Sequence, residues 1–241
     1  MTRSTPPDIG AILFDKDGTL FDFAATWTVW ATRLLARLAE DDEARARAMG
    51  RKIGFDVTTA QFAADSIAIA GTPNQIVSAL MTELPAMSTD DLLQIVNHEA
   101  SNAPMVEAVP LLPLLDRLTA NGLQLGVATN DCEGPALAHL DSAGVRHKFS
   151  FIAGSDSGFG GKPQSGQMEA FCRAVNVPPA RAVMVGDSTH DLVAGRNGGL
   201  WTVAVLTGIA RHGELARWAD VVLPDIGHLP EWLGLDRQSQ A

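Results

Sequence analysis

The chain has 241 residues, of which 46% are hydrophobic and 19% charged, and its formal net charge at pH 7 is −10. This length allows one or two globular domains with a sizeable buried core. The acidic balance argues against a nucleic-acid-binding or membrane-surface protein, because both of those partners are anionic and attract basic patches.

The two cysteines, Cys132 and Cys172, have no CxxC spacing, so the sequence predicts neither a zinc site nor a disulfide framework. We see no apolar leader and no apolar run of transmembrane length. We therefore expect a cytoplasmic protein that binds neither nucleic acid nor membrane.

The first predicted strand is the apolar run 9–14, and a region with helical periodicity follows it. Trp27, Trp30 and Leu34 recur at helical spacing, and we interpret the two tryptophans as packing residues rather than a substrate cage. Helices are predicted at residues 26–39, 43–53, 58–70, 72–81 and 88–97. Residues 21–102 are thus expected to form an all-helical insert.

Strands and helices alternate in the rest of the chain. Strands are predicted at 123–130, 149–154, 182–186, 201–205 and 221–223, and helices at 109–121, 135–143, 165–175, 191–197, 212–218 and 229–233. This alternation predicts an α/β fold with a parallel sheet that is covered by helices on both faces. The helical insert falls between the first and second strands of that sheet.

Polar residues follow the predicted strands where parallel strands end at a common edge. Asp15 and Asp17 come after the first strand, and period-2 alternation places them on one side with Lys16 on the other. The later strands are followed by Thr129 and Asn130, by Lys162, and by Asp187 and Asp191. Read alone, the Asp-Lys-Asp-Gly sequence also fits an ordinary turn. Together, these groups offer a carboxylate nucleophile, oxygen ligands for Mg²⁺, and a hydroxyl and an ammonium for phosphoryl oxygens.

Four signatures in this order resemble the haloacid dehalogenase (HAD) superfamily, in particular its phosphatases of the phosphoglycolate phosphatase type. They are Asp15 to Thr19, Thr129 after an apolar strand, Lys162 before Pro163, and Gly186-Asp187 with Asp191. The resemblance implies a Rossmann-like, three-layer core at residues 1–20 and 103–241. It also implies a helical cap of the C1 type, which corresponds to residues 21–102.

The resemblance also implies a role for each matching residue. Asp15 would attack phosphorus to give an aspartyl-phosphate, and Asp17 would serve as general acid and then general base. Mg²⁺ would be held by Asp15, the Asp17 backbone carbonyl, Asp187 and Asp191, the last directly or through water. Thr129 and Lys162 would bind the transferring phosphoryl group, and Gly18, Thr19 and Asn130 would line the phosphate site.

The function implied is Mg²⁺-dependent hydrolysis of a small phosphorylated metabolite, with phosphoglycolate as one candidate. A phosphomutase of the β-phosphoglucomutase kind is an alternative, because it shares the cap and the pair of acids. A 2-haloacid dehalogenase is a further alternative, against which the second acid, Asp17, argues.

Lys16 departs from the family pattern, in which an apolar residue often separates the two acids. We expect its stem to pack and its ammonium to reach solvent. The alternative is an ion pair with an acid of the cap or the core, such as Asp22.

Overall fold

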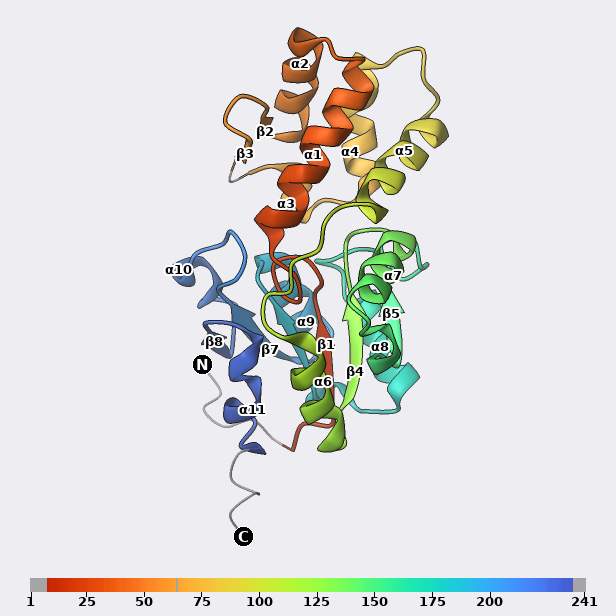
Figure 1. Ribbon diagram of the computed structural model, residues 1–241. Coiled ribbons are helices and arrows are strands. Elements are labelled where there is room, and N and C mark those ends of the chain that lie inside the picture. Colours follow the sequence, from red (N-terminus) through yellow and green to blue (C-terminus); the bar gives the residue numbers. More distant parts are fainter. Residues whose placement is uncertain (1–7, 64, 236–241) are drawn as a thin grey trace.

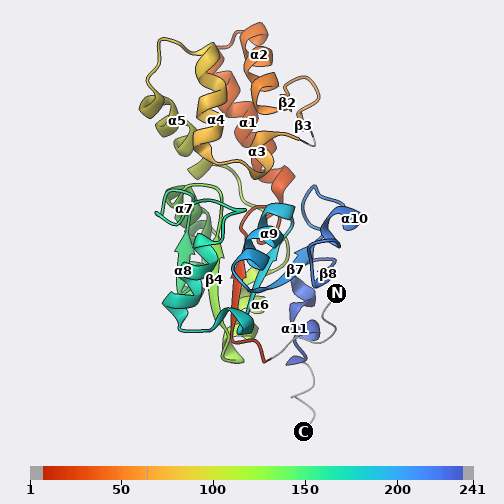
Figure 2. The ribbon, with the colours of Figure 1, turned by 180° about the vertical axis from the view of Figure 1, so that it is seen from behind.

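A computed structural model describes residues 8–63 and 65–235. Figures 1 and 2 show two parts, one above the other. A helical part lies over the edge of a parallel sheet that is flanked by helices.

The sheet has six parallel strands in the order β5-β4-β1-β6-β7-β8. Their bounds are β1 Ala11–Phe14, β4 Gln124–Ala128, β5 Phe151–Ala153, β6 Ala182–Gly186, β7 Trp201–Val205 and β8 Val221–Leu223. Counting only these strands, the spatial order is 3-2-1-4-5-6, which is the Rossmann order. The predicted α/β fold with a Rossmann-like core is confirmed, and the predicted bounds of the last three strands agree with the structure.

Alternation along the central strand separates two hydrophobic layers. Ile12 and Phe14 are buried in one cluster with residues of α6 (Leu111–Ala120) and α11 (Leu229–Trp232), whereas Ala11 and Leu13 belong to a second cluster on the opposite face. The second cluster includes residues of α8 (Gly166–Val175) and α9 (Thr189–Asn197). The first pair of helices is in front in Figure 1 and the second pair in Figure 2. The helices of the core also include α7 (Glu133–Ser142) and α10 (His212–Leu215).

Strand register aligns the residues that follow the central strands. Phe14, the last residue of β1, pairs with Val127 of β4 and with Val185 of β6. The N–H of Asp15 donates to the Val185 carbonyl at 2.8 Å, so the chain stays attached to the sheet one residue further. Asp15 therefore lies at the carboxyl edge of the sheet, level with the residues that follow β4 and β6.

Residues 23–103 bury a hydrophobic cluster of their own, which contains Trp30, Leu34 and Met49. The helices of this part are α1 Phe23–Ala39, α2 Glu43–Ile53, α3 Ile67–Ala70, α4 Pro73–Leu80 and α5 Thr89–Ser101. The two segments that join it to the sheet pair with each other: the Asp22 N–H donates to the Val106 carbonyl, and the Ala108 N–H donates to the Leu20 carbonyl. This paired neck begins at Leu20, three residues after Asp17.

The predicted helix at residues 58–70 is wrong, and so is the expectation that the inserted part is all-helical. Strands β2 (Phe55–Asp56) and β3 (Gln61–Phe62) form a short antiparallel hairpin, and only α3 is helical there. The Asp56 carboxylate accepts the N–H groups of Thr58 and Thr59, and Ala60 adopts a positive φ of 54°. These side-chain hydrogen bonds replace the bonds that a helix would need.

The other predicted helices are present with shifts of a few residues. The first begins at Phe23 rather than at residue 26, because Asp22 caps its N-terminus by accepting the Ala25 N–H. No helix in the described ranges has the length and apolarity needed to span a bilayer.

Two leucines on one helix give a test of how the sheet is held. Leu115 on α6 is fully buried, whereas Leu112 on the same helix is 44% exposed. Leu115→Ala is expected to lower the free energy of unfolding by about 2–5 kcal/mol through lost burial and a residual cavity. Leu112→Ala should change it by less than about 0.5 kcal/mol, as measured by urea denaturation. Equal losses would contradict the assigned packing.

Candidate active site

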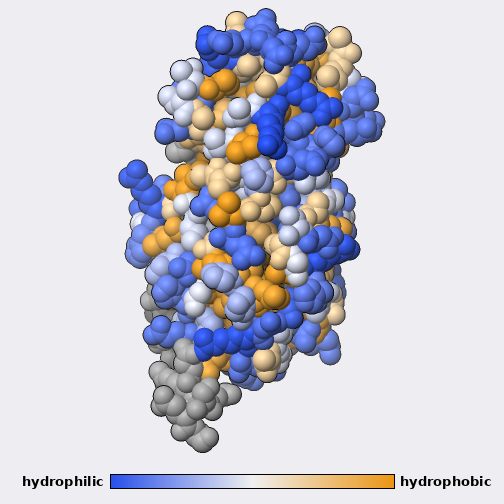
Figure 3. Space-filling model, viewed as in Figure 1, coloured by the Kyte–Doolittle hydropathy of each residue, from blue (hydrophilic) through white to orange (hydrophobic). Residues whose placement is uncertain are grey.

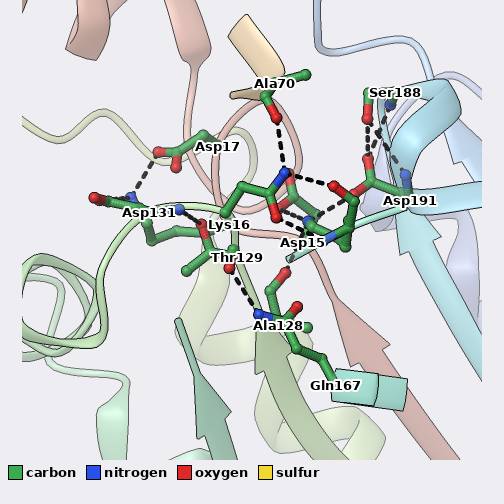
Figure 4. Close-up of polar contacts among 12 residues, drawn as sticks. Asp15, Lys16, Asp17, Ala70, Ala128, Thr129, Asp131, Gln167, Ser188 and Asp191 are labelled. Carbon is green, nitrogen blue, oxygen red and sulfur yellow. Dashed lines mark hydrogen bonds and ion pairs between the residues drawn. The ribbon is translucent and has the colours of Figure 1, made fainter. Parts of the chain in front are cut away.

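A cavity lies between the carboxyl edge of the sheet and the inserted helices. Its walls include Asp15, Asp17, Thr129, Lys162 and Asp187 from the core, and the inserted part contributes residues such as Trp27 and Ile76. The enclosed space is small, about 50 Å³. Figure 4 shows that the labelled polar residues converge here from several strand ends, with Ala70 of α3 above them.

Lys162 neutralises two of the acids. Its Nζ donates to Asp15 Oδ1 at 2.5 Å, to Asp191 Oδ1 at 2.6 Å and to the Ala128 carbonyl at 2.8 Å. All three polar side chains are buried. The two acids raise the pKa of Lys162 above its usual value, although burial acts against this, so its ammonium stays charged.

Asp15, Asp187 and Asp191 form a buried carboxylate cluster with one oxygen from each within 4.8 Å of the others. Burial raises the pKa of Asp15 to about 7, outweighing the attraction of Lys162, and the charge of Asp191 adds to the rise. Burial and the charge of Asp15 likewise raise the pKa of Asp187. Closely spaced, buried carboxylates are difficult to ionise unless a positive charge lies near them. Three carboxylate oxygens are also hard ligands of the kind that bind a divalent cation such as Mg²⁺.

Two glycines make space for the Asp187 carboxylate. A Cβ atom added to Gly18 would lie 2.5 Å from Asp187 Oδ2, and a Cβ added to Gly208 would overlap the same oxygen. Gly18 also has a φ of +81°, which L-residues rarely adopt. The backbone thus approaches the acidic cluster more closely than any larger residue would allow.

Asp191 contributes to the cluster and to helix capping at once. Its Oδ2 accepts the N–H of Ser188 at 3.0 Å and the hydroxyl of Ser188 at 2.7 Å, while its Oδ1 accepts from Lys162. These bonds form the capping box at the start of α9. The geometry therefore fixes both oxygens of this side chain.

The expectation that the Lys16 ammonium reaches solvent is wrong. Lys16 is fully buried, and its Nζ contacts Asp17 Oδ1 at 2.7 Å and Asp131 Oδ2 at 3.3 Å. The alternative, an ion pair with an acid of the cap or the core, is confirmed, although the example Asp22 is not the partner because it caps the start of α1. The period-2 argument fails here because β1 ends at Phe14, so the side chains of Asp17 and Lys16 lie together after the strand (Figure 4).

A histidine connects Lys16 to the inserted helices. His139 Nε2 lies 2.7 Å from the Ala100 carbonyl on α5 and must donate to it, since a carbonyl only accepts. His139 Nδ1 is then the acceptor for Lys16 Nζ at 2.9 Å. Burial, reinforced by the charge of Lys16, lowers the pKa of His139 to about 4, so the ring is neutral.

Asn130 makes a second connection between the two parts. Its Nδ2 donates to the Ala70 carbonyl of α3 at 2.7 Å and to the Lys162 carbonyl at 2.9 Å, and its Oδ1 accepts the Lys162 N–H. Asn130 thus lines the cavity and holds the lysine loop. Thr129 is also in the wall and is buried, and its hydroxyl oxygen accepts the Asp131 N–H at 3.1 Å.

The structure separates the predicted site residues into two groups. It brings together the side chains that line the cavity: Asp15, Asp17, Thr129, Asn130, Lys162, Asp187 and Asp191. Gly18 and Thr19 are not among its lining residues, and the Gly18 N–H donates to the Phe21 carbonyl at 2.7 Å. The side chain of Asp17 is not part of the cluster of three carboxylates found among the described residues, because it contacts Lys16.

Two polar residues of this region were not predicted from the sequence. Asp131 directly follows Thr129 and Asn130 at the end of β4, so its position in that polar run could have identified it. His139 lies in the middle of α7, and nothing in the helical pattern distinguishes it. The tryptophans expected to pack do pack, but both also line the cavity.

Sequence comparison assigns the family. Residues 12–205 match the family of haloacid dehalogenase-like hydrolases. The chain belongs to this family. The predicted resemblance to HAD hydrolases is therefore confirmed, and the protein is a HAD-like hydrolase.

Relatives of this HAD-like hydrolase include several phosphatases. A phosphoglycolate phosphatase from Rhodospirillum rubrum is 31% identical over 230 residues, covering 93% of this chain and 90% of that protein. A phosphoglycolate phosphatase from Caulobacter vibrioides is 30% identical over 225 residues, covering 91% and 89%. A pyrophosphatase PpaX from Bacillus pumilus is 30% identical over 152 residues, covering 61% and 70%.

Solved structures of the same fold cover nearly the whole HAD-like chain. CbbY from Rhodobacter sphaeroides in complex with phosphate has a TM-score of 0.70 at 21% identity, covering 94% of this chain and 99% of that one. A β-phosphoglucomutase from Clostridium difficile has a TM-score of 0.65 at 17% identity, covering 95% and 99%. Both likenesses concern the fold.

The buried position of Lys16 predicts a large effect of its removal. Lys16→Met leaves the Asp131 carboxylate buried without its counter-charge, so we expect the free energy of unfolding to fall by about 3–5 kcal/mol. Burial raises the pKa of Asp131 to about 6, so the loss should be smaller at about pH 5 than at about pH 8, because a protonated Asp131 needs no cation. The matched control is Lys52→Met, which removes an exposed lysine paired with Glu83 at 3.4 Å and should cost less than about 1 kcal/mol. Similar losses for both variants at pH 8 would exclude the assigned ion pairs.

The acidic cluster predicts how stability depends on pH and metal. Because the pKa of Asp15 rises from 3.8 to about 7 in the folded protein, the metal-free protein should lose stability as pH rises through that window. Mg²⁺ displaces the proton, so the increase in Tm on adding Mg²⁺ should be larger at about pH 7.5 than at about pH 5.5. Asp187→Asn should abolish that increase, whereas Asp116→Asn, which changes a half-exposed aspartate, should keep it. An increase that does not depend on pH would contradict this account.

Proposed function

We propose that this HAD-like hydrolase is a Mg²⁺-dependent phosphatase that cleaves a small phosphorylated metabolite through an aspartyl-phosphate on Asp15. The observation that carries the proposal is that Asp15 belongs to the carboxylate cluster at the floor of the cavity and also pairs with Lys162. The relatives named phosphoglycolate phosphatase support the reaction class and make phosphoglycolate a substrate to assay.

In the proposed reaction, an Asp15 oxygen attacks phosphorus, and the bond from phosphorus to the ester oxygen breaks. Asp17 gives its proton to the departing oxygen. Water then attacks the phosphorus of the aspartyl-phosphate, the bond to Asp15 breaks, and Asp17 takes the proton from the water. The contact of Asp17 with Lys16, together with its position in the cavity wall, supports this role because it orients the carboxylate.

Asp15, Asp187 and Asp191, with the Asp17 backbone carbonyl, are the proposed holders of Mg²⁺. The bound cation would supply positive charge for the phosphoryl oxygens and reduce their repulsion from the Asp15 carboxylate. Lys162 would add an ammonium at the same place, and the Thr129 hydroxyl would donate to the phosphoryl group. This charge arrangement allows a carboxylate to approach an anionic phosphate.

The part inserted between β1 and β4 is proposed to be a cap, with domain boundaries at residues 1–20 and 103–241 for the core and 21–102 for the cap; of these, residues 1–7, 64 and 236–241 lie outside the described residues. Its separate hydrophobic cluster and its paired neck support the division. The bonds from Asn130 to Ala70 and from His139 to Ala100 hold the cap against the core. We propose that these bonds keep water from the site during transfer to Asp15.

Free Cys132 and Cys172 support a reducing, cytoplasmic location.

A phosphomutase remains the alternative because the fold is shared with a β-phosphoglucomutase. The cavity argues against it: the cap residues in the wall, such as Trp30 and Val96, are apolar, while a sugar needs hydrogen-bond partners. Incubation with a hexose 1-phosphate separates the two, because a mutase yields the isomer and a phosphatase releases phosphate.

The presence of Asp17 in the cavity argues against the other alternative, a 2-haloacid dehalogenase.

Carboxamide variants of the two acids test the reaction. Asp15→Asn should lower kcat for Mg²⁺-dependent hydrolysis of p-nitrophenyl phosphate by about 10³-fold or more, because the nucleophile is lost. Asp17→Asn should lower it by about 10²-fold or more, because the acid and base are lost. Asp8→Asn, at an exposed aspartate paired with Arg181, is the control and should leave kcat unchanged. Near-normal turnover by Asp15→Asn, in protein with unchanged circular dichroism, would refute the proposed mechanism.

A further inference from the structure

The cavity wall is divided sharply by polarity. Its core side consists largely of polar side chains, five of them aspartates. Its cap side, within the described residues, is apolar and includes Phe23, Trp27, Trp30, Ile69, Ile76 and Val96. In Figure 3, by contrast, hydrophilic residues cover much of the outer surface. The apolar cap wall is therefore an internal feature that faces the catalytic acids.

Positive charge is scarce in this cavity. Lys162 is the one lysine or arginine among the described lining residues, and its ammonium is already shared by two carboxylates and a carbonyl. Lys16 lies outside the lining and is held by Asp17 and Asp131. A bound divalent cation would offset the phosphoryl group and the nearby acids. No further lysine or arginine of the described lining is then left for a second anionic group, and the one histidine there is His190.

We propose that the substrate is a phosphomonoester whose organic part is small, apolar and uncharged, such as a short branched alkyl or phenyl group. This proposal rests on the proposed phosphatase function and names its substrate class. The phosphoryl group lies among the core acids and Lys162, so the organic part faces the cap wall. A carboxylate there would be desolvated against apolar side chains and repelled by the aspartates, whereas an alkyl group gains by burial.

The size and polarity of the wall limit the organic group further. About 50 Å³ is roughly one third of an apolar cavity of about 150 Å³ that admits benzene, so the space favours organic groups no larger than a phenyl ring. Trp27 is 7% exposed and its Nε1–H has no hydrogen-bond partner among the described residues. A single ether or ester oxygen in the substrate is therefore compatible with the wall, but a polyhydroxylated group is not.

An isosteric pair of substrates tests the proposal. Isobutyl phosphate and phosphoglycolate are similar in size and shape and differ in an isopropyl group against a carboxylate. We expect kcat/KM, measured with Mg²⁺ by phosphate release, to be at least about tenfold higher for isobutyl phosphate. From methyl to butyl phosphate, kcat/KM should rise by about fourfold for each added methylene until the space is filled.

A matched pair of variants tests whether the cap wall causes this preference. Ile69 and Ile67 both lie on α3 and are both half-buried, but only Ile69 is in the cavity wall. Ile69→Arg supplies the missing cation and should raise kcat/KM for phosphoglycolate relative to isobutyl phosphate by at least about tenfold. Ile67→Arg should leave this ratio as in the unmodified protein.

The outcomes separate the proposal from the reaction class on which it rests. Preference for isobutyl phosphate that is reversed or reduced tenfold by Ile69→Arg alone supports the proposal. A preference for phosphoglycolate by the unmodified protein overturns it and leaves the phosphatase function intact. A ratio that Ile69→Arg does not change also overturns it, because the wall is then not the cause. Failure to release phosphate from any ester, p-nitrophenyl phosphate included, overturns the proposed function as well.

Discussion

The ion pairs of Lys162 with Asp15 and Asp191 are the interaction on which the site depends. Three carboxylates lie within 4.8 Å of one another in buried surroundings, an arrangement that charge repulsion alone would disrupt. The Lys162 ammonium offsets part of this repulsion, yet burial, together with the charges of the neighbouring acids, still raises the pKa values of Asp15 and Asp187. The remaining negative charge is what suits the site to a divalent cation.

A second buried lysine, Lys16, pairs with different acids. Lys162 pairs with the acids at the floor of the cavity, whereas Lys16 pairs with Asp17 and Asp131 beside it. Through His139, Lys16 is also connected to the Ala100 carbonyl of the inserted part. Asp17, the proposed general acid and base, is thus connected through Lys16 and His139 to the proposed cap. The orientation of Asp17 is therefore coupled to the packing of the cap against the core. The family's usual apolar residue at this position would offer no such connection.

Much of the fold could be predicted from the sequence, because apolar runs and short intervening helices leave few arrangements for a parallel sheet. That topology alone brings Asp15, Thr129 and Asp187 to one edge, whatever the side-chain details. The contact of Lys16 with His139 could not be predicted in the same way, since His139 lies in the middle of α7, whereas Asp131 follows the carboxyl end of β4 beside Thr129. The β2–β3 hairpin was missed because the Asp56 side chain caps a turn within a stretch of helical composition.

The central claim is that phosphorus becomes covalently attached to Asp15, and one measurement tests it directly. The protein is mixed with radiolabelled phenyl phosphate and Mg²⁺, quenched in acid during the first turnover, and digested for peptide mass spectrometry. The account predicts an acid-stable label on the peptide that contains Asp15. Turnover without any covalent label, or an acid-stable label on a different residue such as Thr129, would contradict it.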